Sequence, residues 1–524
     1  MTPPNNNNSE LVFDCTGLKS WQNAAAKAIY DCIVENRFRQ TKRGLLLVAP
    51  TRTGKTFGVA KAIQQAQIND QFPPGGDDLR LCKILVFAPK SCLIQHTRVF
   101  RQLGVKDFMV ISYAAGRSSI GENWIQWVKH LEYGNVAEKP IWRDEDKPDM
   151  IWLDEVQLLK NYKCQAAKVI QAAIEQGILV ICSSATPFVT VDEAKITCMA
   201  LGLVSDHNWV EFSKSFCGVH GPKDLSPANM RRLTDYLEEQ KRIVRYENII
   251  YAHKVFNKCV IVEFPDAATE TYFRKAYEDY LEEIRHINKN APGGLAAIWV
   301  AMLKFRMRAE ECKVPILWKE SERLVKEGFQ VIMASNFVET LRLYWKYGKK
   351  FGFDMSKVVH LTGAVDDMAR QTAVDRFQSG SADIFVTTLK AGGVGLSLHH
   401  ERPTARPRRV LLPPTWSGIE MAQMLGRAHG PTSLSTTKQY IYWFARTIEQ
   451  TVADRCGQRF SCLSELVSKE ENWVKVFNQE VEKDGADNDV GKKLVEEQFD
   501  TDADSGKRIE VIDPNMFAIA EVES

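Results

Sequence analysis

The segment LLLVAPTRTGKT at residues 45–56 is the part of this chain with the most informative pattern. Its first four residues are apolar and predict a strand buried in a parallel sheet. A loop follows, and the pattern predicts a helix that begins at Lys55. A strand, a loop ending in Gly-Lys-Thr and a helix form the arrangement of a phosphate-binding loop. The segment therefore predicts a nucleotide site near the start of the chain.

The residues at the end of this loop suit a bound phosphate. Gly54 has no Cβ, so the backbone can approach a phosphate closely. Lys55 would supply a positive charge beside the β- and γ-phosphates, and the hydroxyl of Thr56 would bind Mg²⁺. The general pattern has a glycine where this chain has Ala49, so the match of this segment alone is incomplete. The predicted ATP-binding residues of the loop are Thr51, Arg52, Thr53, Gly54, Lys55 and Thr56.

Length and composition indicate a large protein of the cell interior. The 524 residues predict two to four domains, and 44% hydrophobic residues suffice for packed cores. No apolar run approaches about 20 residues, so no membrane helix is expected, and the polar start MTPPNNNNSE is unlike a secretory signal. The twelve cysteines form no C-x-x-C pair, which argues against a zinc ribbon and a disulfide scaffold. We expect a cytoplasmic or nuclear protein, or one inside a host cell if the chain is viral.

Charge is unevenly distributed along the chain. Residues 480–524 hold fourteen acidic and five basic side chains, a net of −9, so with +2 for the whole chain residues 1–479 carry +11. A basic body suits a polyanionic partner, although an ordinary charged surface would also fit this modest excess. The acidic end contains few aromatic residues and predicts a disordered tail.

Apolar runs alternate with helical segments in two successive parts of the chain, which predicts two parallel α/β units. Runs at 83–89, 149–155 and 178–187 follow the first segment, and a second set begins at 330–335. We expect a disordered leader at 1–14, a first domain at 15–250 with a helical insert from about 190, a second domain at 251–470 and a mostly disordered tail at 471–524. Ligands of such sheets bind beyond the carboxyl ends of the strands.

Two adjacent carboxylates, Asp154 and Glu155, close the apolar run MIWL. One can hold Mg²⁺, usually through water. The other can orient and deprotonate an attacking water. A solvated strand end would also place acidic residues here, but the upstream Gly-Lys-Thr favours the catalytic interpretation. Gln22 lies in a predicted amphipathic helix. Its amide could bind the edge of adenine, or Gln22 could be an ordinary surface residue.

The ordered segments APTRTGKT, LDEVQ, SSATP, TTLKAGGVGLSL and QMLGRAH resemble the motifs of superfamily-two helicases. The resemblance covers roughly residues 17–465 and is closest to Swi/Snf-type ATPases and the related DEAD/DEAH-like helicases of phages and large DNA viruses. It implies two RecA-like P-loop domains that hold ATP and Mg²⁺ in the cleft between them. The implied partner is nucleic acid, DNA before RNA, and the protein partners are unknown.

The resemblance also implies roles for individual residues. Gln22 would read adenine, Asp154 would hold Mg²⁺, Glu155 would activate water, and Gln423 and Arg427 would reach across from the second domain. Arg427 would act as an arginine finger, which can be worth about 10³-fold or more in rate. The residues implied in coupling hydrolysis to nucleic acid are Ser112, Ser184, Ala185, Thr186, Thr387, Gly392, Gly393 and Gly395.

The chain departs from the motif pattern at three positions. Arg52 stands where the phosphate loop usually has glycine, and Gln157 stands where histidine or aspartate is usual. Gly430 replaces a second arginine three residues after Arg427. The arginines considered as substitutes for that side chain are Arg402, Arg406, Arg408 and Arg409.

Three functions remain open on the sequence. The first is an ATP-driven translocase or helicase on DNA, and the second is an RNA helicase. The third is a protein that clamps nucleic acid under nucleotide control with little turnover, a possibility raised by the replacements at Arg52 and Gly430.

Overall fold

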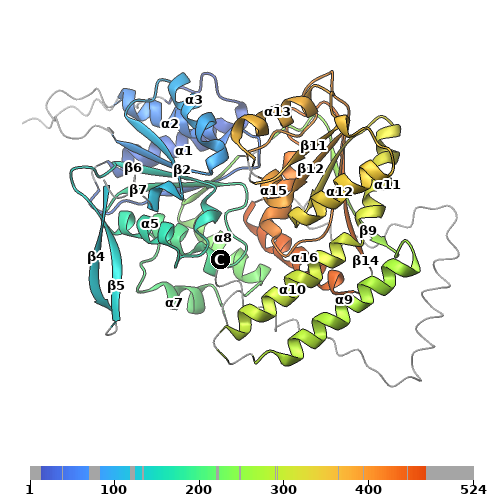
Figure 1. Ribbon diagram of the computed structural model, residues 1–524. Coiled ribbons are helices and arrows are strands. Elements are labelled where there is room, and N and C mark those ends of the chain that lie inside the picture. Colours follow the sequence, from blue (N-terminus) through green and yellow to red (C-terminus); the bar gives the residue numbers. More distant parts are fainter. Residues whose placement is uncertain are drawn as a thin grey trace, which may run out of the picture.

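The structure is a computed structural model that describes residues 13–37, 39–69, 83–117, 124–132, 135–219, 224–246, 249–288, 291, 293–363, 365–393, 395–444 and 447–467. Most of the predicted leader and the whole of the predicted acidic tail lie outside these residues. The fold is α/β, with two six-stranded parallel sheets in tandem, as the alternation of apolar runs predicts. The two sheets and their helices lie side by side (Figure 1). Among the described helices, none is both long and apolar enough to cross a membrane.

The first unit is built on a sheet with the strand order β3-β2-β6-β7-β1-β8. Its strands are β1 (Leu45–Val48), β2 (Ile84–Ala88), β3 (Phe108–Ser112), β6 (Met150–Asp154), β7 (Leu179–Ser184) and β8 (Ile243–Arg245). Its helices are α1 (Ser20–Asn36), α2 (Lys55–Asn69), α3 (Leu93–Gln102), α5 (Gln165–Glu175), α6 (Lys195–Ala200), α7 (Trp209–Glu211) and α8 (Pro227–Glu239).

The second unit repeats this plan with the strand order β11-β12-β10-β13-β14-β9. Its strands are β9 (Val255–Val262), β10 (Gln330–Ser335), β11 (Val358–Leu361), β12 (Ile384–Thr388), β13 (Arg408–Leu412) and β14 (Thr437–Phe444). Its helices are α9 (Ala267–His286), α10 (Gly294–Glu311), α11 (Val314–Lys326), α12 (Val338–Lys350), α13 (Asp367–Gln378), α14 (Leu389–Gly393), α15 (Gly418–Arg427) and α16 (Ile448–Val467).

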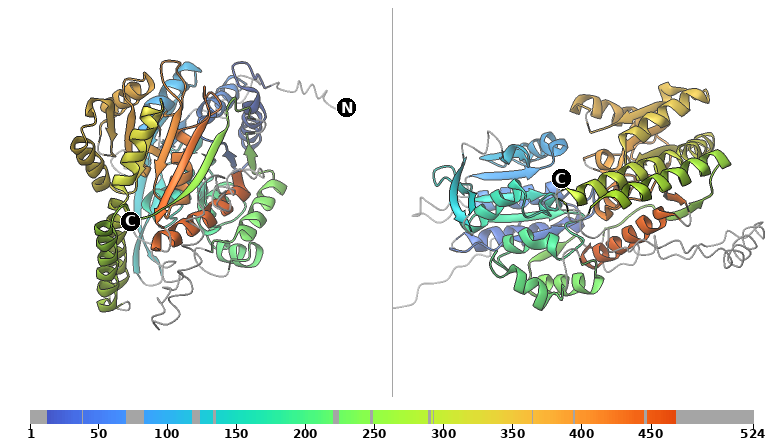
Figure 2. Two further views of the ribbon diagram at one scale, coloured as in Figure 1. Left: turned by 90° about the vertical axis from the view of Figure 1, so that its right-hand side faces the viewer. Right: turned by 60° about the horizontal axis from the view of Figure 1, so that its bottom comes forward.

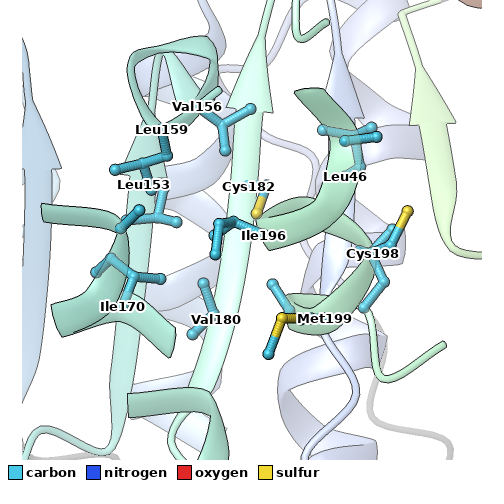
Figure 3. Packing of buried hydrophobic residues seen from close by; sticks show 14 of the residues in the cluster. Leu46, Leu153, Val156, Leu159, Ile170, Val180, Cys182, Ile196, Cys198 and Met199 are labelled. Carbon is cyan, nitrogen blue, oxygen red and sulfur yellow. The ribbon is translucent and has the colours of Figure 1, made fainter. Parts of the chain in front are cut away.

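Each sheet is covered by helices on both faces, which explains why its central strands are continuously apolar. Successive side chains of a strand point to opposite faces. In β1, Leu46 and Val48 join the core beneath α5, α6 and α8, while Leu45 and Leu47 pack against α1 and α2. Figure 3 shows Leu46 in the first of these layers. Because β1, β6 and β7 pair in parallel, their carboxyl ends lie at one edge of the sheet.

The region after residue 190 belongs to the first core more than the predicted insert implies. Ile196 of α6 and Leu233 of α8 are fully or almost fully buried in the same apolar cluster as the strands of the first sheet. The short strand β8 then pairs with β1 at the edge of the sheet. These helices therefore complete the first unit before the chain crosses to the second.

The helix α16 joins the two units. Phe460 and Leu463 lie in the core of the second unit, whereas Cys462 and Leu466 lie in the core of the first. Arg231 of α8 holds Glu465 through a two-pronged ion pair, with bonds of 2.9 and 2.7 Å. The end of the predicted second domain thus packs against the first.

Two further features stand apart from the sheets. The antiparallel hairpin of β4 (Ile125–Glu132) and β5 (Asn135–Trp142) packs beside α5, and the sequence analysis did not predict it. The long helices α9 and α10 pair with each other around Phe273 and Phe305. Figure 2 shows these two helices as a long pair on the second unit.

Candidate active site

The phosphate loop connects β1 to α2 at the carboxyl edge of the first sheet. The helix begins at Lys55, as the motif predicts, and Nζ of Lys55 donates to the carbonyl of Ala49 at 3.3 Å. Gly54 has φ of 81°, a left-handed conformation that favours glycine. A Cβ on Gly54 would lie 2.3 Å from Nε2 of Gln22, so the close approach of these two residues also requires glycine.

Gln22 lies against the backbone of this loop. Its Nε2 donates to the carbonyls of Thr53 at 2.9 Å and Gly54 at 3.2 Å, and its Oε1 accepts from the backbone N–H of Lys19 at 2.8 Å. Trp21 donates to the same Thr53 carbonyl at 3.2 Å. Gln22 is therefore a buried support of the phosphate loop rather than a surface side chain, while contact with adenine stays a prediction.

Asp154 ends β6 in a buried network of hydrogen bonds. His96 of α3 contacts its Oδ2 at 2.8 Å, and Ser183 of β7 donates to its Oδ1 at 2.9 Å. Burial acts to raise the pKa of Asp154, but the hydrogen bond and charge of His96 and the charge of Lys55 together hold that pKa below its ordinary value. The structure therefore keeps this carboxylate ionised next to the phosphate loop.

Glu155 follows in a left-handed conformation, with φ of 58°. This backbone geometry is uncommon for a residue with a side chain and clusters at functional sites. Nε2 of Gln157 donates to Oε2 of Glu155 at 2.6 Å, and Ser184 donates to Oε1 of Gln157 at 2.6 Å. Gln157 thus links Glu155 to the SSATP segment, whose Thr186 backbone N–H donates to Ser184 at 2.8 Å.

The second unit reaches this cluster through α15. Nε2 of Gln423 lies 3.4 Å from Oε2 of Glu155 and 3.5 Å from Oγ1 of Thr186. Gln423 and Glu155 are both buried. The structure therefore brings together a carboxylate of the first unit and an amide of the second, while the role that the resemblance implies for Gln423 stays a prediction.

Arg427 ends α15 and is buried at the same interface. Its Nε donates to the carbonyl of Gly393 at 2.8 Å, and its own carbonyl accepts from the N–H of Leu398 at 3.2 Å. Arg427 also acts electrostatically on Arg52 of the phosphate loop: burial first, and then the charge of Arg427, lowers the pKa of Arg52 to about 9. No described hydrogen bond joins Arg427 to Glu155, so the role of an arginine finger stays a prediction.

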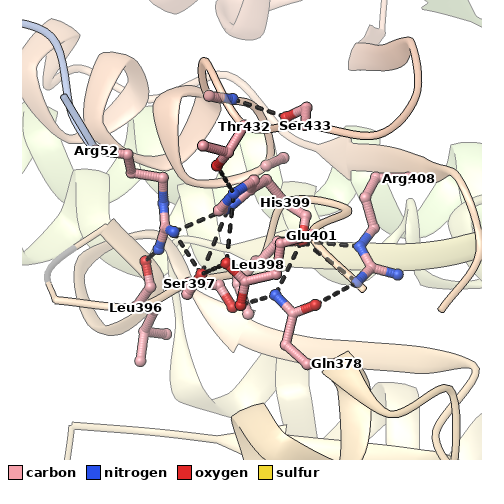
Figure 4. Close-up of polar contacts among 12 residues, drawn as sticks. Arg52, Gln378, Leu396, Ser397, Leu398, His399, Glu401, Arg408, Thr432 and Ser433 are labelled. Atoms are coloured by element: carbon pink, nitrogen blue, oxygen red, sulfur yellow. Dashed lines mark hydrogen bonds and ion pairs between the residues drawn. The ribbon is translucent and has the colours of Figure 1, made fainter. Parts of the chain in front are cut away.

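The side chains of Thr51 and Arg52 connect the phosphate loop to the second unit. Oγ1 of Thr51 donates to the carbonyl of Gly426 at 2.9 Å. The guanidinium of Arg52 donates to the carbonyl of Leu396 and the hydroxyl of Ser397, and it lies 2.8 Å from Nδ1 of His399. Figure 4 shows Arg52 pointing into this segment. The sequence predicted Arg52 as an ATP-binding residue and as a departure from the motif, but it did not predict these three partners in the second unit.

The glycine-rich segment that follows β12 begins as a short helix, α14. Gly392 and Gly393 lie in this helix and are buried. Gly395 has φ of 71°, and a Cβ there would lie 2.8 Å from Oγ of Ser91 in the first unit. The segment therefore faces the other unit, and close packing explains its glycines.

The remaining predicted residues for nucleic acid lie at strand ends. Ser112 ends β3 and accepts from the N–H of Ala115 at 3.1 Å. Thr387 is buried near the end of β12, and Ala185 is buried directly after β7. These contacts are internal, so a role toward nucleic acid stays a prediction for each residue.

The residues present fit a magnesium ion held largely through water. Each carboxylate oxygen of Asp154 accepts one protein hydrogen bond, which leaves capacity for a water bound to the ion. Thr56 stands in the first turn of α2 with a half-exposed side chain. Within the described residues no group of three metal-binding side chains occurs, and Mg²⁺ in phosphate sites needs only one or two carboxylates besides the phosphates.

Sequence reasoning missed two histidines that shape this region. His96 stacks on Trp152 at 5.1 Å and bonds to Asp154, and His399 receives Arg52. Neither lies in a recognised motif position, and their contacts depend on how distant elements pack.

Comparison with known proteins supports the resemblance. No protein-family profile matches the chain. The mimivirus protein named "Putative ATP-dependent RNA helicase" (Acanthamoeba polyphaga mimivirus) is 23% identical over 385 residues, which cover 66% of this chain and 68% of that protein. The human "DNA repair and recombination protein RAD54-like" is 28% identical over 28% of the chain, and the "Chromatin remodeling factor mit1" of Schizosaccharomyces pombe is 26% identical over 22%.

The last two matches cover only part of those relatives. The chain spans 19% of the human protein and 8% of the yeast protein. The matches therefore carry nothing about the whole activity of either protein. Together with the two tandem parallel sheets, these similarities show that the chain is a relative of superfamily-two helicases and Swi/Snf-type ATPases, which are ATP-hydrolysing enzymes.

Proposed function

We propose that this chain hydrolyses ATP in the cleft between its two units and uses the cycle to move along DNA. The contact of Gln423 with Glu155 carries the proposal, because it joins the second unit to the carboxylate best placed to activate water. A site completed by both units couples each hydrolysis step to a change in the cleft. The relatives named for DNA repair and chromatin remodelling favour DNA as the substrate.

Each protein group has one task in this scheme. Lys55 and the N-terminus of α2 would bind the phosphates, and Glu155 would take a proton from the attacking water. Thr56 and Asp154 would hold Mg²⁺, which supplies charge neutralisation on the phosphates when bound. Arg427 would stabilise the charge that develops during transfer.

An RNA helicase is the second candidate, because the mimivirus relative, which matches 66% of this chain, is named as an RNA helicase. ATP hydrolysis by the full chain should be measured alone, with duplex DNA, with single-stranded DNA and with RNA. Lys55→Ala provides the background rate, since that variant lacks the charge beside the phosphates. We expect the largest stimulation by DNA. Stimulation by RNA alone would establish the second candidate, and a rate equal to the Lys55→Ala background in every condition would contradict both.

Movement requires a separate measurement. Displacement of a third strand from a DNA triplex reports translocation on duplex, whereas displacement of one strand of a duplex reports unwinding. We expect triplex displacement that depends on ATP. ATP hydrolysis without either displacement would support a clamp controlled by nucleotide instead.

A further inference from the structure

Two departures from the motif pattern are neighbours in space. By the resemblance, Arg52 stands where the phosphate loop usually has glycine, and Gly430 stands where an arginine is usual after α15. A Cβ placed on Gly430 would lie 3.5 Å from both Cβ and Cδ of Arg52. A side chain longer than alanine at position 430 would therefore compete with the stem of Arg52 for space. The position that lacks an arginine and the position that has an additional one therefore lie in the same part of the interface.

Arg52 adopts a conformation that glycine would adopt more easily. Its φ is 68°, in the left-handed region that side chains disfavour. Such strain persists only where surrounding contacts hold it. The contacts here are those of the guanidinium with Leu396, Ser397 and His399. The side chain, rather than the backbone, accounts for arginine at this position.

The segment that receives Arg52 is held firmly within the second unit. Nε2 of Gln378 donates to the carbonyls of Ser397 at 2.8 Å and His399 at 2.9 Å, and Nε of Arg408 donates to the carbonyl of Leu398 at 2.8 Å (Figure 4). Each backbone carbonyl of residues 396–399 thus accepts a hydrogen bond from a side chain. A bond from Arg52 to this segment ties the phosphate loop to a fixed part of the second unit.

The same segment also contacts Arg427. The N–H of Leu398 donates to the Arg427 carbonyl, and Thr51 donates to the carbonyl of the preceding residue, Gly426. Thr51 therefore contacts the backbone directly before Arg427, whereas Arg52 contacts the segment whose Leu398 binds the Arg427 carbonyl.

The other candidate arginines have partners elsewhere. Arg402 lies 3.8 Å from Asp375, Arg406 pairs with Asp383, and Arg409 stacks on Phe329 at 3.6 Å. Arg408 is buried under the segment that it supports. None of these described contacts reaches the phosphate loop, so Arg52 is the arginine that faces Gly430.

We propose that Arg52 is a positioning residue that takes the role of the arginine missing at Gly430. Arg52 belongs to the first unit, and its side chain holds the backbone around Arg427 next to the phosphate loop. This inference rests on the proposed ATPase function. In this arrangement the guanidinium belongs to the loop that binds the phosphates, whereas an arginine at position 430 would belong to the second unit. Changes in the loop during the ATP cycle would then move the backbone around Arg427 directly.

The test is a reciprocal exchange. Arg52→Gly should fold, since glycine suits the backbone, and should lower kcat by roughly 10- to 100-fold, the range for losing hydrogen bonds to a charged group. ATP affinity should stay near that of the wild type, because the guanidinium binds the second unit. Gly430→Arg alone should also lower kcat, because two guanidinium groups would compete for one place. The double variant Arg52→Gly/Gly430→Arg should recover at least about tenfold over the better single variant, as coupled neighbours do.

Two further variants separate the side chain from the backbone. Arg52→Lys keeps the strained φ and the positive charge but lacks the planar fork, so it should rescue poorly. Arg402→Gly is the matched control, because its arginine is an exposed surface side chain of the second unit, and it should leave kcat unchanged. Equal kcat in Arg52→Gly and wild type, or a double variant whose loss is the product of both single losses, would overturn the proposal.

Hydrogen exchange of the protein without nucleotide keeps this test independent of turnover. In Arg52→Gly the backbone N–H of Leu398 should exchange at least about tenfold faster, since the segment loses its tie to the first unit. Arg402→Gly should leave that rate unchanged. If wild type shows no ATPase activity while this difference persists, the proposed function fails and the tie remains. Unchanged exchange at Leu398 together with unchanged kcat would show that Arg52 does not hold this segment to the first unit.

Discussion

Nε2 of Gln423 lies 3.4 Å from Oε2 of Glu155, although the two residues are 268 positions apart in the sequence. The first comes from α15 of the second unit and the second from the end of β6 in the first. This pair places the proposed catalytic base at the interface between the units. Any change in the interface then alters the surroundings of that carboxylate.

Replacing Glu155 by Gln tests the base. We expect ATP binding to persist and turnover to fall by about 10²- to 10⁴-fold, the usual contribution of a positioned base. The amide has nearly the same shape, and Gln157 and Ser184 remain to hold it. Glu175→Gln is the control, because that carboxylate pairs with Lys139 on the surface. Kinetics and nucleotide titrations decide the matter: a variant that binds no ATP would mark Glu155 as structural.

Replacing Gln423 by Ala tests the contact between the units. We expect kcat to fall by about tenfold, the value of a hydrogen bond to a charged group, with ATP affinity nearly unchanged. The reason is that Lys55 and Asp154 belong to the first unit and are untouched. Gln458→Ala, an exposed glutamine of α16, is the control. A large loss of ATP affinity with normal kcat would mean that Gln423 serves binding rather than the chemical step.

Replacing Arg427 tests the arginine contributed by the second unit. Arg427→Ala should bind ATP and lose about 10³-fold or more in DNA-stimulated turnover. Arg427→Lys should rescue poorly, because lysine lacks both the planar fork and the Nε that donates to Gly393. Rates with and without duplex DNA should be compared for both variants. An alanine variant with normal turnover would show that another side chain completes the cleft.

Lowering the pH should reduce the free energy of unfolding, because His399 resists protonation in the folded state. Its Nδ1 accepts from Arg52, because arginine can only donate, so its Nε2 carries the hydrogen toward Thr432 at 2.9 Å. Burial first, and then the charges of Arg52 and Arg408, lowers the pKa of His399 to about 3. An unfolded histidine takes up a proton near pH 6.5. The stabilising contribution is therefore complete above about pH 6.5 and declines as the pH falls toward 3.

His399→Asn keeps an acceptor near the position of Nδ1 and cannot take up the proton. Between pH 7 and pH 5 the wild type should lose about 1–2 kcal/mol more unfolding free energy than this variant, following the linkage of protons to folding. Denaturant unfolding at both pH values measures the difference. Parallel losses in the two proteins would mean that His399 takes up a proton freely in the folded state.

Local sequence patterns determined most of the secondary structure around the site. The run of apolar residues at β1, the Gly-Lys-Thr that follows and the amphipathic stretch of α2 specify strand, loop and helix within 25 residues of one another. The same reasoning located β2, β6, β7 and β10, because strands buried on both faces are continuously apolar. Polar residues just after these runs predicted which edge of each sheet carries the site.

Weaker local patterns were missed. The strand β8 has only three residues, and its role comes from pairing with β1. The β4–β5 hairpin is partly exposed and does not repeat the apolar runs of the sheets. Short and exposed strands are stabilised by their neighbours more than by their own sequence.

The two α/β units, the phosphate loop and the carboxylates at the strand end could be predicted from the sequence, since each depends on residues close together in the chain. Three relationships became visible only in the folded molecule: Gln22 supports the loop, α16 joins both cores and Arg52 faces Gly430. Arg52 and Ser397 are 345 residues apart, so no periodic pattern records their contact. Their meeting depends on how two separately folded sheets dock, because docking brings together side chains that local propensity leaves independent.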